Sequence, residues 1–150
     1  MRQLNYPVLF YTPTAIWGKN KSETYLRTKT IGSFKEGFFD DGVIIDASGL
    51  KYRVLDYSRR LTPYVALVNV IDALLELFLR PKDEYCTWID FTLSDPEQLS
   101  FEEVKQEIAD LVNKHPRWFV KSHENENAIE EKLSKYDSLR DLIECLAGYP

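Results

Sequence analysis

Histidines, cysteines and paired carboxylates are the residues of this chain that could do chemistry, and their spacing forms no recognisable active site. The two histidines, His115 and His123, lie in no nucleophile motif, although nucleophilic catalysis needs a base beside the nucleophile. A zinc site needs cysteine and histidine ligands at short spacings, whereas Cys86, His115, His123 and Cys145 are scattered. We therefore expect no catalytic residue, no bound metal and no cofactor.

Two pairs of adjacent acids could serve as general acid and base, namely Asp40 with Asp41 and Glu102 with Glu103. Structural roles explain both pairs more simply. Asp40 and Asp41 precede a glycine in a turn-like segment, and Glu102 and Glu103 fall in the first turn of a predicted helix, where the helix dipole favours acids. Glycine-rich phosphate-binding and nucleophile-elbow motifs are missing from the sequence as well. The sequence therefore predicts that the protein is not an enzyme.

Length and composition predict one ordered domain. A chain of 150 residues with 44% hydrophobic and 13% aromatic residues can bury its own core, so residues 1–150 are expected to form a single domain. The amino end lacks the pattern of an export signal, so we expect a cytoplasmic protein. Cys86 and Cys145 lie in apolar segments, which favours reduced, buried thiols over a disulfide.

Residues 62–80 are the most apolar run in the chain and predict a helix on which the rest of the domain packs. Thr62 can cap its first free amides, and Pro63 suits the first helical position. A membrane span is disfavoured because it needs roughly 18 unbroken apolar residues, and acids interrupt this run. We expect the helix to be covered on most sides, since its polar residues form one narrow stripe of Asn69, Asp72 and Glu76.

Strand patterns dominate the first sixty residues. Residues 6–16 and 23–31 are expected to be extended, with a turn at 17–21, and residues 43–46 and 50–57 predict a hairpin. A further strand is predicted at residues 85–93 and another extended segment at 117–121. Helices are predicted at residues 100–114, near 128–136 and from residue 139. In the first of these helices, Ser100 and Glu103 form a capping box. The expected fold class is α+β, an antiparallel sheet of about four to six strands on a central buried helix, with further helices in the second half.

Charge is distributed unevenly along the chain, whose net charge is −5. Residues 1–60 contain ten Lys and Arg against six Asp and Glu, or +4, and residues 61–150 contain nine against eighteen, or −9. Between Asp83 and Asp110 a single cation, Lys105, opposes all the acids. Such a surface repels nucleic acid and attracts basic partners. We therefore expect no direct binding to nucleic acid, even though Arg59 and Arg60 form a small basic patch with Arg53 and Lys51.

Three segments together resemble a known class of proteins: IGSFKEGFFDDGVIIDASGLKYRV (residues 31–54), the acidic middle with the HPRWF segment that follows it, and the closing YDSLRDLIECLAGYP (residues 136–150). They resemble small immunity proteins of bacterial polymorphic-toxin and contact-dependent growth-inhibition systems. The resemblance implies a cytosolic protein that binds and blocks a toxin domain delivered by a neighbouring cell, often a nuclease. It assigns no individual binding residue.

Charge and aromatic content suggest where such a partner would bind. A nuclease toxin must attract phosphate, so an acidic inhibitor can dock on its cationic cleft, with a tryptophan as anchor. We expect a monomer that binds a basic cognate toxin and no membrane. The candidate partner-binding residues are Asp83, Glu84, Trp88, Asp90, Asp95, Glu97, Glu102, Glu103 and Trp118.

A different class of function remains open from the sequence. A small-ligand binding module or enzyme would need a pocket between the strands and the 62–80 helix, and Tyr25, Tyr52 and Tyr64 are the residues expected to line it. A third alternative is a scaffold subunit whose acidic helix face meets another chain.

Overall fold

The computed structural model describes residues 3–13, 16–30, 32, 37–75, 86–115 and 133–146, and of residues 16–20, 72–75 and 145–146 it describes the backbone alone. Within these ranges the fold is α+β, as predicted, with an antiparallel sheet ordered β2-β1-β4-β5-β6-β3 and a short β7 paired with β5. The strands are β1 (Val8–Tyr11), β2 (Ile16–Asn20), β3 (Thr28–Thr30), β4 (Val43–Asp46), β5 (Leu50–Arg60), β6 (Cys86–Leu93) and β7 (Glu97–Gln98). The described helices are α1 (Glu23–Arg27), α3 (Pro63–Leu75), α4 (Phe101–Lys114) and α6 (Leu139–Leu146).

The β4–β5 hairpin is tight because the side chain of Asp46 organises its turn. Oδ1 of this buried carboxylate accepts hydrogen bonds from the backbone N–H groups of Ser48 (2.9 Å) and Leu50 (3.2 Å). Gly49 has a φ of +83°, in the left-handed region that favours glycine. The predicted hairpin is confirmed, and its return strand alternates buried and exposed side chains from residue 52 to 55.

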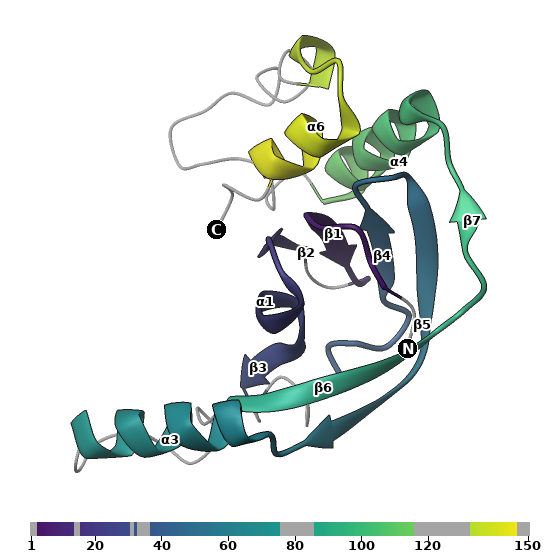
Figure 1. Ribbon diagram of the computed structural model, residues 1–150. Helices are drawn as coiled ribbons and strands as arrows, with labels where there is room; N and C mark the ends of the chain where they lie inside the picture. The colour runs from purple at the N-terminus through teal and green to yellow at the C-terminus, as the bar shows by residue number, and fades with distance from the viewer. Residues whose placement is uncertain are drawn as a thin grey trace.

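Strand β5 belongs to both halves of the sheet. Its residues 51–53 pair with β4, and its residues 54–60 pair with β6. The register shifts between Val54 and Asp56, an irregularity of the kind that bends a strand and increases its twist. The sheet therefore curls along β5, and β6 and β3 lie at the opposite end of the molecule from α4 and α6 (Figure 1).

Two hydrophobic clusters lie on opposite faces of β1, whose four residues are all buried. Because successive strand residues point to opposite faces, Val8 and Phe10 join one cluster and Leu9 and Tyr11 the other. The first cluster also contains Leu26, Phe39, Ile44, Tyr52, Val54, Ile89 and Phe91. The second is closed by α4 and α6, through Val104, Ile108, Leu142 and Ile143.

The helix predicted at residues 62–80 is present as α3, but its expected central, covered position is wrong. Oγ1 of Thr62 accepts a hydrogen bond from the backbone N–H of Val65 at 3.2 Å, as expected of a cap. Val65 is buried, whereas the side chains on the other side of the helix are exposed. The reason is the length of β5, which carries the start of α3 beyond both hydrophobic clusters, so that α3 packs against β6 and projects from the sheet (Figure 1).

Two local predictions in the first thirty residues are also wrong. Residues 17–21, predicted as a turn, fall largely in β2, and residues 23–31, predicted as a strand, begin with α1. In α1, Nε of Arg27 donates a hydrogen bond to Oε1 of Glu23 at 2.9 Å, a pair four residues apart that stabilises a helical turn. The predicted segments at 76–80, 117–121 and 128–132 lie outside the described residues. Among the described helices, none combines the length and hydrophobicity that a membrane crossing requires.

Candidate functional site

Helix α4 begins with the capping box predicted from Ser100 and Glu103. The backbone N–H of Glu103 donates to Oγ of Ser100 (3.3 Å), and the backbone N–H of Ser100 donates to Oε2 of Glu103 (2.7 Å). These hydrogen bonds, the one from the Ser100 backbone most of all, hold the pKa of the Glu103 carboxyl below its usual range. Val104 and Ile108 are buried on the inner face of α4, which leaves Glu102 and Glu103 in solvent.

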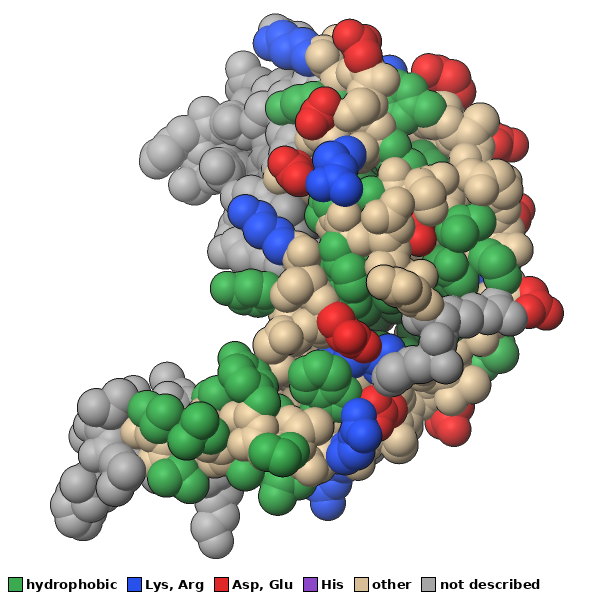
Figure 2. Space-filling model, in the orientation of Figure 1, with side chains coloured by type: hydrophobic (Ala, Val, Ile, Leu, Met, Phe, Trp, Pro, Cys, Tyr) green, Lys and Arg blue, Asp and Glu red, His purple; other side chains and the backbone are tan. Residues whose placement is uncertain are grey.

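Five exposed acidic side chains lie along one side of the molecule, and we call this surface the acidic ridge. Its members come from the connection after β6, from β7 and from the outer face of α4: Asp95, Glu97, Glu102, Glu103 and Asp110. Figure 2 shows acidic side chains along the upper right edge, where Figure 1 places α4 and β7. The structure therefore brings together four of the predicted partner-binding residues, Asp95, Glu97, Glu102 and Glu103.

Two lysines beside the acidic ridge are paired with carboxylates of α4, while Lys114 in the last turn of α4 is exposed. Nζ of Lys51 lies 2.7 Å from Oε1 of Glu107, which also accepts a hydrogen bond from the hydroxyl of Tyr11. Nζ of Lys105 lies 3.8 Å from Oε1 of Glu102, and the side chains of Lys51 and Lys105 are only 17% and 22% exposed. Glu107 is thus paired within the fold, and Glu102 in part.

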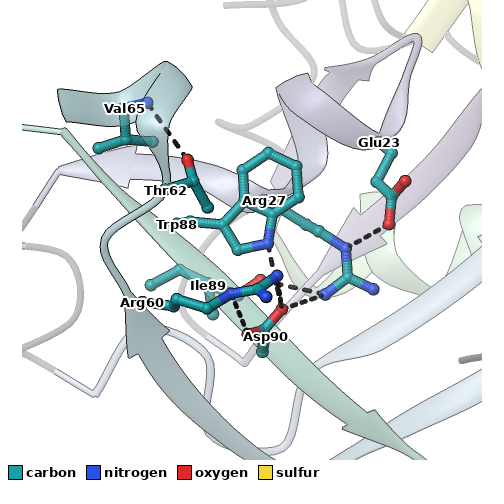
Figure 3. A network of polar contacts seen from close by, with 8 residues as sticks. All are labelled: Glu23, Arg27, Arg60, Thr62, Val65, Trp88, Ile89 and Asp90. Carbon is teal, nitrogen blue, oxygen red and sulfur yellow. Dashed lines mark hydrogen bonds and ion pairs between the residues drawn. The ribbon is translucent and has the colours of Figure 1, made fainter. Parts of the chain in front are cut away.

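Asp90 has an internal role, shown in Figure 3. Its Oδ1 accepts a hydrogen bond from the indole N–H of Trp88 (3.1 Å) and lies 3.5 Å from Nη1 of Arg27, while its Oδ2 lies 2.9 Å from Nε of Arg60. The guanidinium of Arg27 is buried and also donates to the backbone oxygen of Ile89 at 3.1 Å. Because a buried arginine needs compensating charge, Asp90 stabilises the fold, and we leave Asp90 and Trp88 out of the proposed interface.

The remaining predicted partner-binding residues lie outside the described part of the chain. These are Asp83, Glu84 and Trp118, and the structure places none of them relative to the acidic ridge.

Sequence reasoning missed an exposed apolar surface on α3, which we call the α3 stripe. Tyr64, Leu67, Val70 and Ile71 are 51%, 58%, 55% and 45% exposed, and their spacings of three and four residues place them on one side of the helix. Figure 2 shows apolar side chains along the helix that Figure 1 labels α3. No signal in the sequence could have located the stripe, because a helix that is apolar all round does not reveal which side its own sheet covers.

The three tyrosines expected to line the pocket of the alternative hypothesis have different surroundings in the described part of the chain. Tyr52 is 3% exposed within a hydrophobic cluster, whereas Tyr25 and Tyr64 are exposed on α1 and α3. An open groove of about 500 Å³ lies elsewhere, beside α6, and is lined by Lys135, Tyr136, Asp137, Asp141 and Glu144.

The other candidate chemical groups have structural surroundings. Oδ1 of Asp40 accepts a hydrogen bond from the hydroxyl of Tyr57 at 2.6 Å, which is the main reason that the pKa of Tyr57 is raised to about 12. The backbone N–H of His115 ends α4 by donating to the carbonyl of Leu111. Cys86 is half-buried at the start of β6. Within the described ranges, no three His, Cys, Asp or Glu side chains are grouped as metal ligands.

Comparisons with known proteins do not assign the chain to a family. No protein-family model matches the chain, and no curated protein or solved structure matches it. The function is therefore argued from the residues and their geometry.

Proposed function

We propose that this chain is an immunity-type protein that binds a basic toxin domain through the acidic ridge and blocks it stoichiometrically, without catalysis. The observation that supports this proposal is the exposure of Asp95, Glu97, Glu102, Glu103 and Asp110 on one side of the molecule. In the resemblance to immunity proteins, the partner is a toxin delivered into the cytoplasm, so the cytoplasm is where the inhibitor acts.

The electrostatics of the acidic ridge suit a cationic partner. Acids gathered on one surface raise the local concentration of a basic protein and speed its association, by roughly 10- to 1000-fold in favourable cases. Lys51 and Lys105 are already paired with carboxylates, so they repel a basic partner less than unpaired lysines would. A surface of this sign repels the phosphates of nucleic acid, and we therefore propose a protein as the direct partner.

The components of the ridge differ in how freely they can pair with a partner. Glu103 already accepts hydrogen bonds from the backbone and hydroxyl of Ser100, so its carboxylate is held in a fixed position at the start of α4. Glu102 has a side chain that is 81% exposed, with a long contact of 3.8 Å to Lys105. We propose that Glu102 and Glu97 make direct ion pairs with the toxin and that Glu103 contributes mainly to the long-range field.

The proposal is tested with a candidate toxin domain, to be sought in the open reading frame immediately upstream of the one that encodes this chain. The two proteins are purified separately and mixed, and complex formation is followed by calorimetry while toxin activity is assayed. We expect a complex of equal stoichiometry in the two chains and loss of toxin activity at equimolar inhibitor. Absence of both a complex and inhibition would reject the proposal.

A further inference from the structure

We draw no further inference here: the strongest candidate, the α3 stripe of exposed apolar side chains Tyr64, Leu67, Val70 and Ile71, is a helix face for which nothing in the described part of the structure shows what covers it.

Discussion

Asn69 of α3 makes two hydrogen bonds with the main chain of Cys86, each 2.9 Å long. Its Nδ2 donates to the carbonyl oxygen of Cys86, and its Oδ1 accepts from the backbone N–H of the same residue. The side-chain amide thus pairs with the first residue of β6 as a neighbouring peptide group would. Together with buried Val65, this pairing holds α3 against the sheet and turns the α3 stripe outward.

Replacing Asn69 by leucine should loosen α3. Asn69→Leu leaves the N–H and C=O groups of Cys86 without these partners, and the free energy of unfolding should fall by about 1–3 kcal/mol. Denaturant unfolding measures the loss, and hydrogen exchange should show faster exchange of the α3 amides. The matched control is Asn113→Leu on the exposed face of α4, which should stay within about 0.5 kcal/mol of the wild type. Equal losses in the two variants would contradict this account of Asn69.

Asp90 should matter for stability and not for toxin binding. Asp90→Asn removes one of the two carboxylate charges that compensate buried Arg27, the other being that of Glu23, and the free energy of unfolding should fall by about 2 kcal/mol. This is less than for a fully buried pair, because the Asp90 side chain is 28% exposed. Asp95→Asn, on the acidic ridge, should show the reverse pattern, with unchanged stability and slower association with the toxin. If folded Asp90→Asn associates with the toxin more slowly than the wild type does, Asp90 belongs to the binding interface.

The capping box should make stability depend on acid pH. The Glu103 carboxyl has a lowered pKa in the folded protein, so its stabilising effect is present above its ordinary value of 4.5 and is lost as the pH falls through the folded-state value. Glu103→Gln should therefore be less stable than the wild type at neutral pH, and the difference should shrink at acid pH. Denaturant unfolding at the two pH values measures this, with Glu102→Gln, outside the capping box, as control. A constant difference at both pH values would contradict the mechanism.

Much of the fold could be predicted where local sequence and tertiary packing agree. The β4–β5 hairpin follows from strand alternation around a turn that Asp46 and Gly49 can form, and α4 follows from its capping box and its inward row of apolar residues. The strand predicted at 85–93 is confirmed as β6, paired on both sides, with Thr87, Ile89 and Phe91 buried.

The predictions failed where contacts between distant parts of the chain determine the local structure. Residues 23–27 alternate as a strand would, but the Glu23–Arg27 pair and the buried contacts of Arg27 with β6 favour a turn of helix. The exposure of α3 depends on where β5 ends relative to the two clusters, which its own composition cannot reveal. The ion pairs of Asp90 with Arg27 and Arg60 could not be predicted either, because these partners are far away in sequence.

The acidic ridge was predictable as a charged segment but not as a surface. Acids at residues 95–110 were evident from the sequence, whereas their common exposure depends on β7 pairing with β5 and on α4 packing its inner face on the second cluster. The ion pair between Lys51 and Glu107, which are 56 positions apart in the sequence, likewise could be identified only from the folded structure.

The most direct test of the acidic ridge is the rate at which the protein associates with the proposed cognate toxin domain, measured by stopped flow at several salt concentrations. The triple variant Asp95→Asn, Glu97→Gln, Glu102→Gln should associate about tenfold more slowly at low salt and with a flatter salt dependence. Asp56→Asn, which neutralises an exposed acid on β5, should behave as the wild type. Association of the triple variant at the wild-type rate, with the same salt dependence, would contradict a role for the ridge.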